Sequence, residues 1–384
     1  MAGAQCGSKR FLFVTWDGGG NFVPALRIAG ALAARGHEVT FIGQRALARR
    51  VERQGHAFHA FEGAPAWTAG RSIEEDRPAF AGLLSGTDTA KEVTAAIELV
   101  EPDAIVVDCM LAGGLAAAER SRVPAAVLVH VLDHACADGI LARSFSTMMP
   151  VVNDTRSGLG LAPVAAYADL LEPMALVLVT TVEVLELPSS RPHDNVRYIG
   201  PVFDDEPQTP VPDLPGDDRP VVLVSFSTTY QHQEEPLQRV ADALAELPVS
   251  GLMTLGDVLA PDVLSLPPNV AVRTFAPHDV VLPRASLVIT HAGLGTVMAA
   301  LAHGVPLVCM PMGRDQDTNA RRVEALGAGV ALPVDAGVPE IGQAVAEVLG
   351  TPSYREAARR LQGTFASAPG AVGCADELER LCAR

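Results

Sequence analysis

Short apolar runs that alternate with helical patterns constrain this chain more than any other feature. In the first half, the runs of strand length are 10–16 (RFLFVTW), 38–42 (EVTFI), 104–107 (AIVV) and 125–129 (AAVLV). Helical periodicity appears between them at 24–35, where a proline opens the pattern, and at 111–121. Strands that are apolar at every position are typical of a parallel sheet with both faces covered by helices.

The alternation stops at 206–220 (EPQTPVPDLPGDDRP), a segment rich in proline and acidic residues that we interpret as a linker. It then restarts. The predicted strands are 221–226, 251–255, 270–274, 287–290 and 306–310, and the predicted helices are 235–247 and 293–303. The tail is predicted to form two helices around a break at 368–370.

The pattern predicts two Rossmann-like, doubly wound α/β domains that face each other across a cleft. The expected division is 1–205, the linker 206–220, 221–351, and C-terminal helices at 352–384, of which the last crosses back to the first domain. Ligands bind at the carboxyl ends of the strands in such sheets. We therefore expect a two-substrate enzyme with one substrate in each domain.

Charge and hydropathy exclude several classes of protein. A net charge of -16 argues against nucleic-acid binding, which needs a basic face. The chain contains no apolar run of the ~18 residues that a membrane span needs, and the first ten residues lack the apolar core of a secretory signal. The six cysteines form no C-x-x-C pair. We expect a cytoplasmic protein with reduced thiols.

The predicted strand 287–290 runs directly into His291-Ala292-Gly293-Leu294-Gly295-Thr296. A strand, a glycine-rich turn and a helix start present unpaired N–H groups and a positive dipole end, which together suit a phosphate. The glycines let an anion approach the backbone, and His291 and Thr296 add side-chain donors. A tight turn without a ligand is the alternative.

Asp315 and Gln316 follow the predicted strand 306–310. A carboxylate beside an amide suits the neighbouring hydroxyls of a sugar. The alternative is a helix N-cap followed by a polar residue of the first turn. Asp315-Gln316-Asp317 also has the D-x-D form of some metal–diphosphate sites, but no further oxygen ligands cluster nearby, and no metal is predicted.

Taken together, these segments resemble a known signature. Phe275-Ala276-Pro277-His278, Thr290–Gly293, Gly304-Val305-Pro306, Pro311 and Asp315-Gln316 stand in the order and spacing of the nucleotide-sugar motif of GT-B glycosyltransferases. More narrowly, the chain resembles the enzymes that glycosylate bacterial natural products (macrolides, aromatic polyketides, enediynes), which are related to those of plant secondary metabolism. The likeness covers most of the chain.

The resemblance implies a role for each matching residue. Phe275 would stack on the nucleobase, and Ala276 to His278 would read it through the backbone. His291 would bind the diphosphate. The remaining implied donor-site residues are Gly293, Leu294, Gly295 and Thr296 for the phosphate turn, Asp315 and Gln316 for the sugar hydroxyls, and Ser227 and Thr228 for a polar loop near the diphosphate.

One departure from the family concerns the nucleotide. Many members place a glutamate on the ribose hydroxyls eight residues after the motif histidine, and this chain has Ala299 there. The absence of an acceptor for the 2′-hydroxyl fits thymidine better than uridine. In this family TDP donors usually carry deoxyhexoses, so a TDP-sugar is expected as co-substrate and a UDP-sugar is the less favoured one. No cofactor is expected.

A second departure concerns the first-domain loop, Asp17-Gly18-Gly19-Gly20-Asn21. Dinucleotide binding is disfavoured, because Val23 replaces the third glycine of that fingerprint. Family members usually have a histidine at the position of Asn21, which deprotonates the acceptor, and an aspartate that matches Asp108. An amide takes no proton near neutral pH, so the family's dyad is broken here.

Three alternatives remain for the base. Asp108 acts directly if desolvation raises its pKa. A second imidazole enters, either His130 at a strand end or His134 after it. Or the acceptor is itself acidic, and Asn21 only orients it. Each residue also has a structural alternative. Asp108 could be the N-cap of the helix 111–121, and His130 could be a histidine at a strand end whose hydrogen bonds are satisfied within the protein.

The acceptor pocket is expected in the segments 62–90 and 133–165. Their large side chains Trp67, Phe80, Met148 and Met149 suit a flat, apolar acceptor, and packing of the loops themselves is the alternative.

From these residues and the resemblance we expect an inverting, metal-independent glycosyltransferase that moves a deoxyhexose from a TDP-sugar to a small hydrophobic natural product. The alternatives are a catalytically weak GT-B-like auxiliary partner and a sugar-nucleotide epimerase. A homodimer is expected from the family alone.

Overall fold

The computed structural model describes residues 7–67, 76–132, 139–187, 194–203, 218–227, 231–256 and 259–383. Most of the predicted linker 206–220 lies outside these ranges, as do Thr228 and His134. The chain divides into two compact units, and each is described here by itself. Unit 1 comprises Met1–Asp204 with Ala368–Arg384, and unit 2 comprises Asp205–Ser367.

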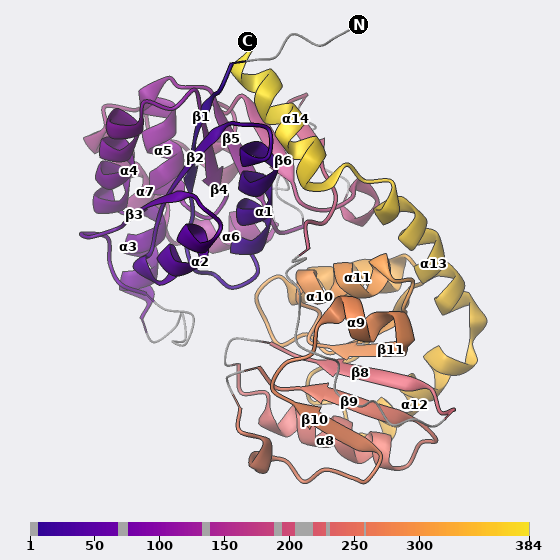
Figure 1. Cartoon of the computed structure of the whole chain (residues 1–384). Coiled ribbons are helices and arrows are strands. Elements are labelled where there is room, and N and C mark those ends of the chain that lie inside the picture. The colour runs from indigo at the N-terminus through magenta and orange to yellow at the C-terminus, as the bar shows by residue number, and fades with distance from the viewer. Residues whose placement is uncertain are drawn as a thin grey trace, which may run out of the picture. The chain divides into compact units, whose positions relative to one another are not determined.

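Unit 1 is built on a parallel sheet in which the strand order is β3-β2-β1-β4-β5-β6-β7 (Figure 1). The strands are β1 (Arg10–Val14), β2 (Glu38–Gly43), β3 (Ala57–Ala60), β4 (Ala104–Asp108), β5 (Ala125–Val129), β6 (Leu176–Val179) and β7 (Val196–Tyr198). The order reverses between β1 and β4, where Val14 pairs with Val107. Such a reversal leaves the following loops splayed apart at the carboxyl ends, which is where α/β sheets bind ligands.

Helices cover both faces of this sheet. They are α1 (Phe22–Ala33), α2 (Ala48–Arg53), α3 (Arg77–Ser85), α4 (Thr87–Val100), α5 (Ala112–Ser121), α6 (Ile140–Ser146), α7 (Met149–Gly158) and α14 (Gly370–Cys382). Because side chains alternate along a strand, Leu12 and Val14 enter one core and Phe11 and Phe13 enter the other. Both cores consist of apolar side chains, which explains why the strands are continuously apolar.

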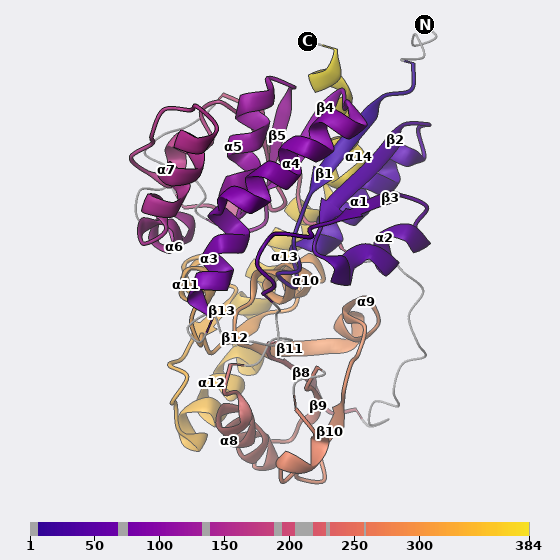
Figure 2. The same ribbon diagram turned by 90° about the vertical axis from the view of Figure 1, so that its left-hand side faces the viewer.

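Helix α14 lies beside α1, although the whole of unit 2 separates them in sequence (Figures 1 and 2). Its Cys374, Leu378 and Leu381 are buried in the core that α1 also lines. At the rim, Arg35 is 2.8 Å from Glu379 and from Asp376. The last helix of the chain is therefore an integral part of unit 1.

Unit 2 has a second parallel sheet, in which the strand order is β10-β9-β8-β11-β12-β13. Its strands are β8 (Val221–Ser225), β9 (Ser250–Thr254), β10 (Val270–Arg273), β11 (Ala285–Thr290), β12 (Leu307–Cys309) and β13 (Gly329–Ala331). Its helices are α8 (Glu234–Ala245), α9 (His278–Val281), α10 (Leu294–Ala302), α11 (Gln316–Ala325), α12 (Val338–Gly350) and α13 (Pro352–Ala366). The order reverses between β8 and β11, as it does between β1 and β4.

The prediction of two parallel-sheet α/β domains is confirmed. Except for β6, which falls in none of the runs given above, the central strands lie where the apolar runs predict them, to within two residues at each end. The edge strands β3, β7 and β13 were not predicted, because they are only three or four residues long and largely half-buried and so lack a continuous apolar run, whereas the edge strand β10 was predicted. Helices α3 and α4 occupy much of the segment predicted as loop at 62–90.

Candidate active site

The predicted donor-binding residues lie near the point where the strand order of unit 2 reverses, between β8 and β11. His291 follows β11, Ser227 follows β8, and Asp315 and Gln316 follow β12, which is the neighbour of β11. All of these strands are parallel, so these residues lie at one edge of one sheet.

His291 is buried, with 8% of its surface exposed. Its ring lies 6.2 Å from the ring of Phe226, and its Nδ1 lies 3.4 Å from Thr290 Oγ1. Burial lowers the pKa of His291 to about 4, with a hydrogen bond to the Ser225 backbone acting against it and the charge of Arg314 adding to it. The imidazole is thus neutral at pH 7 and carries a single N–H.

The turn after His291 has the backbone geometry of an anion site. Ala292 adopts a left-handed conformation with φ +64°, unusual for a residue with a side chain. Gly293 is the N-cap of α10, and a Cβ there would lie 2.6 Å from His291 Nε2. Leu294 is buried, Gly295 is exposed and Thr296 is half-buried. Helix α10 therefore begins where the sequence predicts the phosphate turn, and the N–H groups of its first turn have no carbonyl partner within the helix.

Asp315 and Gln316 are positioned differently from each other. Asp315 is half-buried at the N-cap of α11 but makes no capping hydrogen bond; its Oδ2 instead accepts one from Asn319 Nδ2 at 2.9 Å. Gln316 is 2% exposed. Its Oε1 accepts from the Met312 N–H at 2.7 Å, and its Nε2 donates to Gln231 Oε1 at 3.0 Å. The carboxylate is the more accessible member of the pair.

The residues predicted for the nucleobase lie in the loop after β10. Phe275 is 60% exposed, which is unusual for its size and suits a stacking surface. Ala276 is buried, and His278 Nε2 is 3.4 Å from Ser225 Oγ. Burial lowers the pKa of His278. Ala299, the position of the missing glutamate, is 3% exposed.

In unit 1, Asp108 ends β4 at the reversal of strand order, and it is 3% exposed. Its Oδ1 accepts hydrogen bonds from Trp16 Nε1 at 3.0 Å and from the Met110 N–H at 2.9 Å. Its Oδ2 accepts one from Asn21 Nδ2 at 2.8 Å. His130 Nε2 lies 3.2 Å from both oxygens. These contacts fix the orientation of the carboxylate.

These contacts do not support Asp108 as a direct base. Burial by itself would raise the pKa of the Asp108 carboxyl, but the charge and hydrogen bond of His130, with hydrogen bonds from Asn21 and Met110, hold it below its ordinary value. The condition set for a direct base, a raised pKa of Asp108, is therefore not met. Asp108 is not a helix N-cap either, because α5 begins at Ala112 with Leu111 as its N-cap.

Asn21 is committed to the protein rather than to an acceptor. Its Nδ2 donates to Asp108 Oδ2 and to the Trp16 carbonyl, and its Oδ1 accepts from the Gly18 N–H at 3.0 Å. Only 3% of the residue is exposed. Both donor hydrogens and one lone pair of the oxygen are in use, so the contacts of Asn21 are to the protein and do not by themselves favour the alternative in which it orients the acceptor. Its role is to anchor the carboxylate.

His130 is the partly accessible member of the group, with 15% of its side chain exposed. Its Nε2 faces Asp108, so Nδ1 is not engaged by the carboxylate. Burial would lower its pKa, but the neighbouring Cys109 and Asp108 raise it well above its ordinary value. By spacing, Asp108, Cys109 and His130 could together hold a metal ion. The carboxylate, however, already accepts the protein donors named above.

The aromatic residues predicted for the acceptor pocket lie in the core instead. Trp67 and Phe80 are 3% and 7% exposed. Their rings are 5.1 Å apart, and Trp16 lies 5.7 Å from Trp67. Met148 belongs to the same core, and Met149 packs against it. Packing, the alternative given above, accounts for these side chains.

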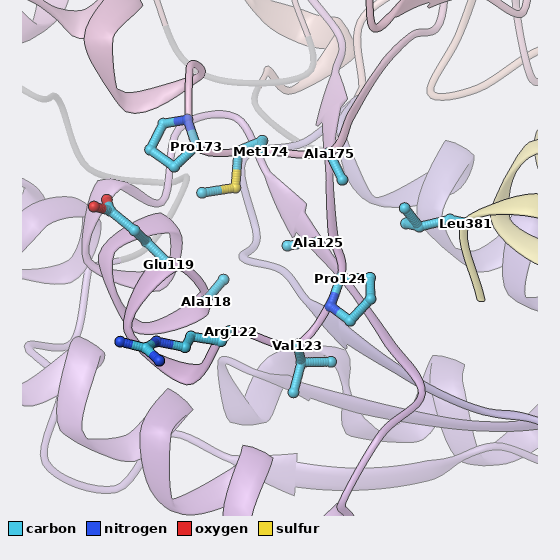
Figure 3. A pocket seen from close by; sticks show the side chains of 10 residues that line it. All are labelled: Ala118, Glu119, Arg122, Val123, Pro124, Ala125, Pro173, Met174, Ala175 and Leu381. Atoms are coloured by element: carbon cyan, nitrogen blue, oxygen red, sulfur yellow. The ribbon is translucent and has the colours of Figure 1, made fainter. Parts of the chain in front are cut away.

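A shallow hollow of about 370 Å³ lies elsewhere in unit 1 (Figure 3). It is lined by residues at the amino ends of β5 and β6, among them Arg122, Pro124 and Met174. Asp108 is at the opposite, carboxyl edge of the sheet, so this hollow is separate from the candidate site. In the described part of the chain, no helix is both long and apolar enough to cross a membrane.

Sequence reasoning missed three residues of these sites: Trp16, Gln231 and Asn319. Each acts through a contact with a residue distant in sequence, and none has a motif of its own. Asn319, three residues after Gln316, carries the only local signal, because that spacing places two polar side chains on one side of a helix.

Comparison with known proteins shows which chains this one resembles. Residues 238–381 match the protein family described as Erythromycin biosynthesis protein CIII-like, C-terminal domain. The 4'-demethylrebeccamycin synthase of Lentzea aerocolonigenes is 28% identical over 421 residues, covering 97% of this chain and 99% of the relative. The demethyllactenocin mycarosyltransferase of Streptomyces fradiae is 34% identical over 198 residues, which is 48% of this chain and 43% of that protein.

Solved structures give the same result. The calicheamicin glycosyltransferase CalG4 superimposes with a TM-score of 0.83 at 25% identity and 99% coverage of both chains. The glycosyltransferase of kitacinnamycin has a TM-score of 0.82 at 23% identity, covering 97% of this chain and 99% of the other, and shows the fold alone. The predicted resemblance to natural-product glycosyltransferases and the GT-B fold are confirmed.

Proposed function

We propose that this chain, a natural-product glycosyltransferase of the GT-B type, transfers a deoxyhexose from a TDP-sugar to a small hydrophobic acceptor. The transfer inverts the anomeric carbon and uses no metal ion. One observation carries the donor assignment: a buried, neutral His291 lies against the N-terminus of α10, and Asp315 follows the neighbouring strand. Phosphate and sugar oxygens are the groups that such a pair of sites would bind.

The donor half of the reaction belongs to unit 2. As the bond between the anomeric carbon and the diphosphate oxygen breaks, negative charge grows on TDP. The N–H groups at 293–296, the dipole of α10 and the neutral His291 N–H stabilise that charge without reorganising. Asp315 holds the sugar hydroxyls. The hydrogen bonds from these N–H groups and the positive end of the α10 dipole would supply the stabilisation that a metal ion supplies elsewhere, so we propose that no metal takes part.

The acceptor half belongs to unit 1. We assign His130 as the group that takes the acceptor's proton while the acceptor oxygen forms the new bond to the anomeric carbon. Asp108 orients the imidazole and stabilises the imidazolium that forms. Asn21 and Trp16 hold Asp108 in place. The histidine that the family places in the first loop is thus replaced by one at the end of β5.

The donor assignment is tested by titrating TDP and UDP into the protein by calorimetry in EDTA. We expect micromolar binding of TDP, clearly tighter than UDP, and loss of most of that affinity in His291→Ala. Equal affinity for UDP would remove the thymidine argument. Binding of neither nucleotide would overturn the donor site.

Turnover separates the remaining alternatives. A transferase releases TDP only when an acceptor is present, an epimerase isomerises the donor alone, and an auxiliary partner binds TDP without turnover. Screening TDP-sugars against apolar phenols and alcohols, with the donor alone as control, tells these outcomes apart.

A further inference from the structure

A buried asparagine joins the two loops that form the donor site. Asn319 lies on α11 and is completely buried. Its Nδ2 donates to the Ala292 carbonyl at 2.9 Å and to Asp315 Oδ2 at 2.9 Å. The first partner follows β11 and the second follows β12. Both hydrogens of one amide group therefore bridge the phosphate turn and the sugar-binding carboxylate.

The bond to Ala292 has a consequence for the next N–H group. A peptide unit is planar and trans, so the direction of the Ala292 carbonyl sets the direction of the Gly293 N–H. Gly293 is the N-cap of α10 and Ala292 is held at φ +64°. Asn319 thereby sets the direction of the first N–H of the phosphate turn.

The bond to Asp315 leaves part of that carboxylate free. Oδ2 is occupied by Asn319, whereas Oδ1 accepts no hydrogen bond from the residues that the structure describes. A carboxylate held through one oxygen is fixed in orientation and still offers the other to a ligand hydroxyl.

Asn319 Oδ1 is buried without a hydrogen-bond partner in the described part of the chain. An unsatisfied buried acceptor is a cost that folded proteins usually avoid. The amide cannot be reversed to relieve it, because its oxygen would then face two other oxygens. The side chain is held by its Nδ2 bonds, which is what a role in positioning requires.

We propose that Asn319 is a positioning residue that makes the phosphate turn and the sugar-binding carboxylate one unit. Nucleoside diphosphate affinity and sugar affinity then depend on the same amide. This inference rests on the proposed donor function and adds to it a residue that touches neither part of the donor.

The test uses an isosteric substitution. Asn319→Asp keeps the shape but replaces the donor group with an acceptor beside Asp315 and the Ala292 carbonyl. The matched control is Asn269→Asp in the same unit, because Asn269 Nδ2 also donates to two oxygens, the Leu244 carbonyl at 2.8 Å and the Val249 carbonyl at 3.1 Å. Asn269 precedes β10, at the amino edge of the sheet. Both variants lose comparable bonds, and only one of them is at the donor site.

TDP affinity is the first measurement. We expect Asn319→Asp to weaken TDP binding about tenfold, the factor that 1.4 kcal/mol represents, and Asn269→Asp to change it less than twofold. Thermal unfolding of both variants measures their loss of stability. Equal weakening in the two variants, or TDP affinity of Asn319→Asp within twofold of wild type, overturns the proposal.

Sugar affinity is the second measurement. TDP-glucose and further TDP-hexoses are titrated until one binds more tightly than TDP. We expect Asp315→Ala to lose this sugar increment, Asn319→Ala to lose most of it, and the double variant to lose no more than Asp315→Ala. Additive losses contradict the coupling. Wild-type protein that binds no TDP overturns the proposed function itself, which distinguishes the two failures.

Discussion

At the scale of single residues, two histidines, one buried and one partly accessible, have opposite electrostatic surroundings. Burial dominates at His291 and lowers its pKa to about 4. At His130 the neighbouring Cys109 and Asp108 outweigh burial and raise the pKa well above its ordinary value. In the proposed transfer, a neutral donor beside the leaving diphosphate and a basic imidazole beside the acceptor are the two states that His291 and His130 would supply.

His291 predicts a loss of stability in acid. Below about pH 6.5 residue 291 is protonated in the unfolded state. In the folded state it stays neutral until the pH approaches its pKa of about 4. The free energy of unfolding of unit 2 therefore falls as the pH decreases through this window, by an amount on the order of 3 kcal/mol. Urea unfolding from pH 7 to pH 4 measures it. The variant His291→Gln lacks this contribution, and an unchanged pH dependence in that variant would contradict the assignment.

His130 predicts a pH dependence of turnover. Its raised pKa means that kcat/KM increases as the pH rises through a value above 6.5, where the imidazole loses its proton. We expect His130→Ala to lower kcat by ~10²–10⁴-fold and to flatten the profile. The control is His59→Ala on β3, outside the site. A profile that persists in His130→Ala would show that another group is the base.

At the scale of elements, the turn between β11 and α10 is determined by close packing. A Cβ at residue 293 would lie 2.6 Å from His291 Nε2. Glycine is therefore favoured there by the lack of space for a side chain. Its backbone conformation is not the reason, since a φ of -59° is accessible to any residue.

Gly293→Ala is therefore expected to displace the His291 ring and to reduce TDP affinity at least tenfold. Gly342→Ala on α12 is the matched control, because a Cβ there meets nothing within 4 Å. Alanine is favoured over glycine in a helix by about 1 kcal/mol, so the control should unfold at a higher temperature with TDP affinity unchanged. Calorimetry and thermal unfolding of both variants check this. TDP binding at wild-type strength in Gly293→Ala would refute the packing argument.

At the scale of the whole molecule, the chain returns to its first unit at its end. Helix α14 completes a core of unit 1 through Cys374, Leu378 and Leu381 and carries the ion pairs to Arg35. Contacts between segments this distant in sequence tie the folding of unit 1 to the completion of the chain.

Removing residues 368–384 should destabilise unit 1 and leave the donor site of unit 2 intact. Thermal unfolding and limited proteolysis report on unit 1, and TDP calorimetry reports on unit 2. Loss of TDP binding on truncation would show that the donor site depends on α14.

A point variant gives the same information without truncation. Leu378→Ala removes a fully buried side chain and should cost ~2–5 kcal/mol. Val372→Ala on the same helix is the control, because Val372 is 63% exposed and its loss should change stability by less than about 0.5 kcal/mol.

The sequence by itself determined the fold class and the donor motif. Continuous apolar strands imply a covered parallel sheet, and residues of the loop after β11 and of the loop after β12 must share one sheet edge when their strands are neighbours. Local periodicity and turn chemistry carry the fold class and the motif, and neither of these depends on the order of the strands.

Only the tertiary structure shows which side chains surround Asp108 in a chain that lacks the family's first-loop histidine. Asn21 and Asp108, 87 residues apart, meet because β1 and β4 pair, and His130 joins them because β5 pairs with β4. The burial of Trp67 and Phe80, and the bridge made by Asn319, depend on strand order in the same way. Strand order is a property of the whole sheet, and hydrophobic periodicity within one segment does not encode it.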